Sequence, residues 1–345
     1  MHVMDEYTCI NLKQLPPYKG NGRYVSIEQK RRRIMKVFST ESQKRKKAWM
    51  DRIKNWQLYF MVLPALTYTI IFSYIPMYGI LIAFKDYKLK VGVMGSPWVG
   101  FDNFTQLFDS FWAPIIVKNT LGISILSLAI SFPLPIIVAL MLNEVHNKSY
   151  KHIVQTISYA PHFISTVVIC GMITLFLSPS YGIVNMIIEF FGGEKIYFLR
   201  DAQYFKGVYV LSGVWQSLGW NTIIYTAALS AVDQSLLDAA EIDGASRLQK
   251  IRYINFPVLV PTIVILFILQ CGSLLSVGYE KVYLLQSDTN LRASEVISTF
   301  VYKVGLVDRN FSFSTAAGLL NSVVNAVVLI IVNTITKKIS DNGLF

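Results

Sequence analysis

The sequence contains little charge for its length. Lys, Arg, Asp and Glu together make up 15% of the 345 residues, whereas hydrophobic residues make up 53%. A soluble chain of this size does not need so large an apolar fraction for its core. Six long stretches contain no charged residue at all, namely residues 58–84, 119–142, 153–177, 208–229, 257–277 and 315–335. Because about 20 apolar residues cross a bilayer as a helix, the sequence predicts an all-α polytopic membrane protein with six transmembrane helices.

The lack of Lys, Arg, Asp and Glu inside these stretches restricts the kind of transport that the chain can perform. Each such charge costs about 2.5 to 3.5 kcal/mol at the centre of a membrane helix, so proteins keep one there for a function. An ion-coupled secondary transporter normally needs such groups for its coupling ion. A buried proton relay is therefore not predicted, and a secondary transporter stays the alternative from a different functional class.

Catalytic and metal-binding motifs are absent as well. The three cysteines, Cys9, Cys170 and Cys271, show neither pairing nor metal-ligand spacing, so we expect no disulfide framework and no metal site. No nucleophile triad or pair of carboxylates suggests an enzyme, and no catalytic residue is predicted. No Gly-x-x-x-x-Gly-Lys-Ser/Thr loop occurs, so any nucleotide must be bound and hydrolysed by another polypeptide.

Positive charge is concentrated at the N-terminal end. Residues 1–57 contain 14 of the 32 Lys and Arg residues, and the net charge is +11. Basic residues before a first span favour the cytoplasmic side and contact anionic lipid, so residues 1–55 are predicted to be a cytoplasmic tail that binds no nucleic acid. With six spans, both termini are expected in the cytoplasm. The first apolar run is too long for a signal peptide, so we expect it to stay in the mature protein.

A short charged segment separates two of the predicted spans. It contains Asp238-Ala-Ala-Glu-Ile-Asp-Gly-Ala245 and, further on, Ile254-Asn-Phe-Pro257. Ser235, with an acid three residues later, predicts the N-terminal cap of a short helix. Gly244 predicts a sharp turn because glycine tolerates positive φ. A second helix is expected after this turn. Periodicity alone fits either an amphipathic hairpin on the membrane surface or a loop that docks on a partner.

The segment resembles the cytoplasmic EAA loop of permease subunits of ATP-binding-cassette (ABC) importers, whose pattern is Glu-Ala-Ala, then Asp-Gly-Ala, then Ile-x-Leu-Pro. The matching residues are Ala239, Ala240, Asp243, Gly244, Ala245, Ile254 and Pro257. Asp238 stands in place of the leading Glu, and Phe256 in place of the Leu. The resemblance implies that residues 233–257 couple the chain to an ATPase, through Asp238, Ala239, Ala240, Glu241, Asp243, Gly244 and Ala245.

Further segments are similar to the carbohydrate permeases, and within them to the polysaccharide-permease branch. They are Trp98-Val-Gly-Phe-Asp-Asn-Phe104, Asn119-Thr-Leu121, Tyr159-Ala-Pro-His-Phe-Ile-Ser165, Gly278-Tyr-Glu-Lys-Val-Tyr-Leu-Leu285 and Thr299-Phe-Val-Tyr-Lys-Val-Gly-Leu306. The resemblance implies that residues 56–345 form the transmembrane domain of a type I ABC importer permease in the bacterial cytoplasmic membrane. It implies these partners: a second permease subunit in a heterodimer, two ATP-binding-cassette subunits that hold ATP and Mg, and an extracytoplasmic solute-binding protein. The expected substrate is an oligosaccharide or polysaccharide fragment, and a non-sugar solute is the alternative within the family.

Polar and aromatic residues in the fourth and fifth spans are the candidates for a sugar path, because sugar rings present both hydroxyl rims and flat CH faces. The predicted residues are Trp215, Gln216, Ser217, Trp220, Asn221, Gln270, Ser273, Tyr279 and Glu280. By resemblance to maltose permeases, Trp215, Ser217 and Trp220 occupy sugar-contacting positions, of which only Trp215 keeps the residue type, and Gln270 and Ser273 occupy two further such positions. Trp packing or helix–helix hydrogen bonds are alternative roles. For Glu280 we expect an ion pair with Lys281 or Arg292, and for His162 a hydrogen bond to a carbonyl freed at the Pro161 kink.

Overall fold

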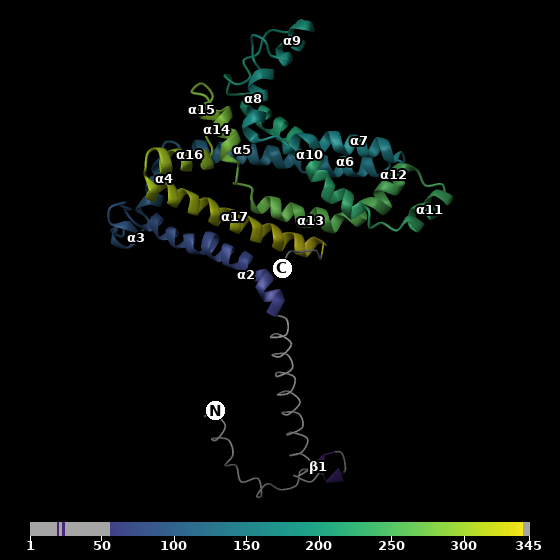
Figure 1. Cartoon of the computed structure of the whole chain (residues 1–345), viewed down its shortest axis with the longest axis horizontal. Helices are drawn as coiled ribbons and strands as arrows, with labels where there is room; N and C mark the ends of the chain where they lie inside the picture. The colour runs from purple at the N-terminus through teal and green to yellow at the C-terminus, as the bar shows by residue number, and fades with distance from the viewer. Residues whose placement is uncertain (1–18, 21–22, 25–55, 341–345) are drawn as a thin grey trace. The chain divides into compact units, whose positions relative to one another are not determined.

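The computed structural model describes residues 19–20, 23–24 and 56–340, and the chain divides into two compact units, residues 1–77 and 78–345 (Figure 1). Most of the predicted basic tail lies outside the described residues. The described residues of the tail are β1 (Lys19–Gly20) and β2 (Arg23–Tyr24), which form an antiparallel pair with Lys19 opposite Tyr24. The role and boundary of the tail therefore stay predictions.

The rest of the described chain is mainly helical. In chain order its elements are α2 (Trp56–Thr69), η2 (Ile70–Tyr74), η3 (Ile75–Phe84), α3 (Gly92–Gly95), α4 (Asp102–Asp109), α5 (Ala113–Ser131), α6 (Pro133–Asn143), α7 (Lys148–Tyr159), η4 (Ala160–Phe163), α8 (Thr166–Phe176), α9 (Ile183–Phe190), α10 (Phe205–Leu229), α11 (Gln234–Ile242), α12 (Arg247–Lys250), η5 (Ile251–Asn255), α13 (Phe256–Gly272), α14 (Tyr279–Leu285), α15 (Leu291–Ser294), α16 (Ile297–Tyr302), η6 (Lys303–Val307) and α17 (Phe311–Ser340). The predicted all-α membrane architecture is confirmed.

Four continuous helical segments of the described chain are long and apolar enough to cross a membrane, and a bent pair makes a possible fifth. The four are Trp56–Phe84, Ala113–Asn143, Arg247–Gly272 and Phe311–Lys338. The predicted fourth span corresponds to α10, which is 25 residues long but less apolar. Lys206, Gln216 and Asn221 lower its hydropathy, so it has the length of a span without the composition of one.

The structure corrects two predicted span boundaries. The second span begins at Ala113 rather than at residue 119, with a proline in the first turn of α5, a position where its missing N–H is not needed. The fifth span ends at Gly272 rather than at residue 277. There the Leu275 N–H donates to Asn325 Oδ1 of α17 at 2.9 Å, which holds the chain in a non-helical turn.

The predicted third span is broken rather than continuous. The helices Lys148–Phe163 and Thr166–Phe176 meet at an angle of 100°. The break follows Pro161, and Ser165 caps the new helix by accepting a hydrogen bond from the Val168 N–H at 3.4 Å. His162 does not make the expected contact there. Its ring stacks on Trp220 with centroids 4.4 Å apart and planes 5° apart.

Helix α10 is the central packing element of the second unit, since it contacts α5, α6, α7 and α13. Three clusters of buried apolar side chains join the helices: one links α5, α8, α10 and α14, one links α4, α5, α16 and α17, and one links α6, α10 and α13. Beside them Gly219 of α10 is buried against the backbone of Ser158 in α7, so close that a Cβ atom would overlap the Ser158 carbonyl oxygen.

Gly219→Ala is expected to destabilise the chain by about 1 to 3 kcal/mol, because the added methyl group must push two helix backbones apart. Gly171→Ala is the matched control: Gly171 also lies inside a helix, α8, and a Cβ atom there has no neighbour within 4 Å. The apparent melting temperature in detergent measures both variants. A Gly219→Ala variant as stable as Gly171→Ala would contradict the close packing.

Most of the spanning surface is apolar and uncovered. In the second unit, only about a fifth of the most apolar 18-residue stretch is buried in each of Ala113–Asn143, Arg247–Gly272 and Phe311–Lys338. Within the second unit, α11 and α12 lie at the end of the helical layer opposite α4 and α16 (Figure 1). The charged segment between α10 and α13 therefore lies at one end of the spanning helices.

Candidate functional site

The segment 233–257, here called the elbow, begins with a helix that an aspartate caps. The Asp233 carboxylate accepts a hydrogen bond from the Ser235 N–H at 2.9 Å, so α11 starts at Gln234. The predicted Ser235 cap is wrong, because a carboxylate two residues earlier offers a charge-assisted bond to the same orphan amides. The same bond holds the pKa of Asp233 below its usual value, so the cap stays ionised near neutral pH.

Gly244 ends α11 in the left-handed conformation that the sequence predicts, with φ +76°. The Ala245 N–H donates to the Ala240 carbonyl at 2.9 Å, and the Gly244 N–H donates to the Glu241 carbonyl at 3.1 Å. These two bonds are those of a Schellman motif, which satisfies the last carbonyls of a helix. The turn is therefore fixed by backbone hydrogen bonds rather than by side-chain packing.

The second half of the elbow is continuous with the fifth span. Ser246 caps α12 by a reciprocal capping box with Gln249, and the helix runs through η5 into α13 without a break. The continuous helix begins at Arg247, and Pro257, the predicted entry into the span, lies at the start of α13 directly after the π-helical segment η5. A movement of α12 along its axis reaches the span directly.

Two contacts tie the elbow together and to the spans. Lys250 Nζ lies 3.3 Å from Glu241 Oε2, so an ion pair joins α12 to α11 across the Gly244 turn. The buried Asn255 side chain donates to Glu144 Oε1 at 3.1 Å, at the end of α6. Because the Glu241 carboxylate is 71% exposed, its ion pair adds little stability and serves orientation.

The outer surface of the elbow combines apolar and acidic side chains. Ile242 is 86% exposed and Leu248 is 74% exposed. Of the predicted coupling residues, Asp238, Ala239, Glu241, Asp243 and Gly244 are exposed, whereas Ala240 and Ala245 are half-buried. Large apolar side chains that are surrounded by charge and uncovered by the rest of the chain are typical of a surface that binds another protein.

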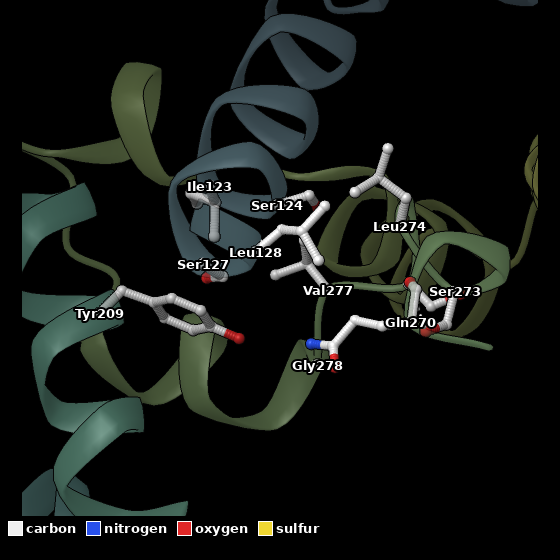
Figure 2. A pocket seen from close by; sticks show the side chains of 11 residues that line it. Ile123, Ser124, Ser127, Leu128, Tyr209, Gln270, Ser273, Leu274, Val277 and Gly278 are labelled. Atoms are coloured by element: carbon white, nitrogen blue, oxygen red, sulfur yellow. Dashed lines mark hydrogen bonds between the residues drawn. The ribbon is translucent and has the colours of Figure 1, made fainter. Parts of the chain in front are cut away.

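The spans enclose a polar cavity of about 180 Å³ between α5, α10, α13 and the turn after α13. Figure 2 shows the Tyr209 hydroxyl and the Gln270 amide pointing toward one another across it. Four serines add hydroxyl groups. The cavity is lined by Ile123, Ser124, Ser127, Leu128, Tyr209, Gln270, Ser273, Leu274, Ser276, Val277 and Gly278. Hydroxyl and amide groups beside apolar walls are the surroundings that a sugar ring requires.

Two of the nine predicted path residues, Gln270 and Ser273, line this cavity. The fourth-span residues do not: Gln216 donates to the Ile164 carbonyl at 3.4 Å, Ser217 donates to its own helix at Gly213, and Trp220 stacks on His162. Trp215 is nearly half exposed, and Asn221 is half-buried outside the cavity lining. Their role as sugar contacts stays a prediction.

Tyr279 and Glu280 also lie outside the serine-lined cavity. The Tyr279 ring stacks on Tyr302, with centroids 5.2 Å apart, at the edge of another cavity of about 390 Å³. Glu280 is exposed, and the described part of the chain shows no ion pair for it. The expected pairing with Lys281 fails because α14 directs the two neighbouring side chains to different surroundings.

Lys281 is instead buried against α10. Its ammonium group donates to the Tyr209 carbonyl at 3.2 Å and lies 5.0 Å from the centroid of the Tyr209 ring. Burial lowers the pKa of Lys281 to about 8, so the side chain still carries its charge at pH 7. A positive charge therefore lies directly behind the tyrosine that faces the cavity.

Sequence reasoning missed Tyr209, Ser124, Ser127 and Ser276. Each stands singly in an apolar run, where a serine suggests helix–helix packing. The spacing gave a usable signal: Ser124, Ser127 and Leu128 fall on one helical face at i, i+3 and i+4. Among the residues that the structure covers, no group of three His, Cys, Asp or Glu side chains is arranged to hold a metal ion.

Comparison with known proteins identifies the family that this architecture matches. Residues 131–341 match the family described as binding-protein-dependent transport system inner membrane component. The chain is 42% identical over 305 residues to the polygalacturonan/rhamnogalacturonan transport system permease protein YteP of Bacillus subtilis strain 168, covering 88% of this chain and 95% of that protein. It is 40% identical over 300 residues to protein LplB of the same organism, covering 86% and 94%.

Two solved structures share the fold. One is the crystal structure of a bacterial ABC transporter involved in the import of the acidic polysaccharide alginate, with a TM-score of 0.78 and 40% identity over 85% of this chain and 99% of that chain. The other is a bacterial alginate ABC transporter in complex with a pentasaccharide-bound periplasmic protein, with a TM-score of 0.79, 40% identity and coverage of 86% and 99%.

Proposed function

Since the chain belongs to the family of binding-protein-dependent transport system inner membrane components, we propose that it is a permease subunit of an ATP-driven importer that moves an oligosaccharide or polysaccharide fragment across the bacterial cytoplasmic membrane. Alternating access of the helical bundle carries the sugar, which a solute-binding protein delivers on the outer side. The single observation that carries this proposal is the elbow: an exposed, internally hydrogen-bonded turn that is continuous with a spanning helix.

The elbow supports coupling to a separate ATPase in three ways. Its exposed Ile242 and Leu248 suit a cleft in a partner protein. The Schellman turn at Gly244 keeps α11 and α12 at a fixed angle. The unbroken helix from Arg247 to Gly272 transmits a displacement of the elbow into the fifth span. ATP and Mg are bound by the partner, because the chain contains no phosphate-binding loop.

A second permease subunit completes the pathway in this proposal. The spans leave most of their apolar surface uncovered, and the serine-lined cavity is small, at about 180 Å³, for a multi-unit glycan. A related chain that packs against these helices encloses a larger path between the two subunits. The elbow and both termini then lie in the cytoplasm.

Reconstitution tests the proposal. The chain is co-produced with candidate second permease and ATPase subunits, incorporated into proteoliposomes, and supplied with a glycan-loaded solute-binding protein. We expect uptake of the glycan only with ATP inside the vesicles and with all subunits present. Uptake by the chain alone, driven by an ion gradient, would identify a secondary transporter instead. ATP-dependent uptake of a peptide or metal ion but of no glycan would favour the non-sugar alternative.

Within this assay, Gln270→Met is expected to slow glycan uptake about tenfold, because the variant removes an amide that faces the serine-lined cavity and a hydrogen bond to a substrate contributes about 1 to 1.5 kcal/mol. Gln216→Met is the matched control, since Gln216 was predicted for the same path but bonds the Ile164 carbonyl instead. Equal uptake by both variants would show that the cavity does not lie on the sugar path.

A further inference from the structure

A larger cavity, of about 520 Å³, contains three positively charged side chains. Lys118 comes from α5, Lys206 from the first turn of α10 and Arg292 from α15. The other lining residues are Ile115, Asn119, Ala202, Gln203 and Ala293, none of which is acidic. We call this the cationic cavity.

The described part of the chain provides no carboxylate partner for these three cations. The ion pairs it contains involve Lys88, Lys195, Lys250 and Lys303. Of the acids nearest in sequence, Asp201 accepts from the side chain of the lining residue Gln203 at 2.7 Å but forms no ion pair with the three cations, and Glu295 accepts from Lys303. Like charges that share a cavity without a counter-charge repel one another, and an anion that binds in the cavity offsets this repulsion.

Packing positions the helices that carry the cationic side chains, of which Lys118 and Arg292 are exposed and Lys206 is half-buried. The buried Asn119 amide donates to the Arg292 carbonyl at 2.8 Å and to the Glu295 carbonyl at 3.0 Å, which fastens α15 to α5. A Cβ atom on Gly122 would lie 2.7 Å from Lys206 Nζ, so the amine lies along α5 one turn after Lys118. The lack of a side chain at Gly122 leaves room for that amine.

The cationic cavity lies at the end of α10 away from the elbow. Lys206 is in the first turn of α10 and the elbow follows Leu229, a rise of about 35 Å along the helix. Tyr209, which lines the serine-lined cavity, follows Lys206 by one turn. A glycan that enters at the side opposite the elbow therefore meets the cationic cavity before the serine-lined one.

We propose that the cationic cavity binds a carboxylate group of an acidic glycan at the outer entrance of the permease, so that the substrate is a polysaccharide fragment built from uronate units. This inference rests on the proposed importer function and adds the charge of the substrate. A guanidinium and two ammonium groups supply charge-assisted hydrogen bonds to a carboxylate. Arg292 is further positioned by the Phe111 ring, whose centroid lies 5.9 Å from its guanidinium carbon.

A glycan fits this cavity better than the other anions of a membrane surface. A lipid headgroup brings acyl chains that need a long apolar groove, whereas the apolar lining here consists of one isoleucine and two alanines. An acidic side chain of the solute-binding protein supplies one carboxylate, whereas the cavity presents three cations. Consecutive uronate units supply one carboxylate each, at a volume that accommodates about one or two sugar rings.

The test compares two probes of equal length, trigalacturonate and its uncharged methyl ester, on the full-length chain in nanodiscs of zwitterionic lipid. The triple variant Lys118→Gln, Lys206→Gln and Arg292→Gln is measured beside the wild type. Lys195→Gln is the matched control, because Lys195 pairs with Glu189 outside the cavity. We expect the triple variant to weaken trigalacturonate binding at least about tenfold, to leave binding of the ester unchanged, and to lower the salt dependence of binding.

Three outcomes would overturn the inference. Equal loss for both probes would assign the residues a structural role. No loss for either would remove the cavity from the path. A binding defect that appears only in vesicles with anionic lipid would assign the cavity to a lipid headgroup. A defect only in the affinity for the ligand-free solute-binding protein would assign the cavity to docking of that protein. Because binding is measured without ATP or transport, a failure of the importer function leaves this result readable: glycan uptake can fail while trigalacturonate still binds through the three cations.

Discussion

Gly244→Val is expected to reduce ATP-driven uptake by at least about tenfold while ATP hydrolysis by the partner subunits continues. A β-branched residue in the left-handed conformation costs about 1 to 2 kcal/mol, which shifts the equilibrium constant for forming the turn by about 5- to 30-fold. The cause is backbone strain alone, because a Cβ atom at Gly244 has no neighbour within 4 Å. When the backbone relaxes to relieve this strain, the hydrogen bonds from the Ala245 N–H to the Ala240 carbonyl and from the Gly244 N–H to the Glu241 carbonyl break. The helix α11 then turns away from the ATPase subunit.

A second glycine of the chain isolates this effect. Gly192 has φ +82° and likewise has no neighbour within 4 Å of a Cβ atom, but it lies outside the elbow. Gly192→Val therefore imposes the same backbone strain without touching the coupling surface. Uptake and ATPase rates are measured in the same proteoliposomes at matched protein levels. Normal uptake by Gly244→Val, or an equal loss in Gly192→Val, would count against the coupling role of the elbow.

Lys303→Met is expected to cause the largest loss of stability. The Glu295 side chain is 4% exposed, and its Oε2 atom accepts from Lys303 Nζ at 2.6 Å and from the Gln286 amide at 3.2 Å. Its Oε1 atom has no partner in the described part of the chain. Removal of Lys303 leaves a buried carboxylate without its counter-charge, at a cost of about 3 to 5 kcal/mol. Because Lys303 itself is partly exposed, we expect a value near 3 kcal/mol.

The apparent melting temperature in detergent measures this loss, and two controls define it. The double variant Glu295→Gln with Lys303→Met removes both charges and is expected to regain much of the lost stability. Lys88→Met breaks an ion pair whose two side chains are both more than half exposed, and we expect a change below about 0.5 kcal/mol. If Lys303→Met and Lys88→Met melt at the same temperature, the Glu295 carboxylate is not held by Lys303.

The spans were predictable because their signal is local. Composition over about 20 residues decides whether a helix partitions into lipid, so the predicted bounds 58–84 and 315–335 differ from Trp56–Phe84 and Phe311–Lys338 by at most four residues. The 100° bend between Phe163 and Thr166 was not predictable. Pro161 marks a weak point in the helix, but the angle depends on contacts of distant residues, such as the stacking of His162 on Trp220.

The elbow and the serine-lined cavity also differed in how far the sequence predicted them. The turn at Gly244 has a backbone cause that a single residue reveals, and its φ of +76° confirms the prediction. The wall of the serine-lined cavity depends on how α5, α10 and α13 are rotated about their axes, which no single-helix pattern reports. Gln270 therefore lines this cavity and Gln216 does not, although both are glutamines in predicted spans.

The polar character of α10 has a consequence for how the protein is made. A helix with Lys206, Gln216 and Asn221 gains too little from lipid to partition on its own as it leaves the ribosome. The helices α5 and α6 precede it in synthesis and present surfaces that it covers, whereas α13 follows. Membrane entry of α10 thus depends on earlier helices that remain nearby, and assembly of the bundle proceeds by recruitment rather than by independent insertion of each segment.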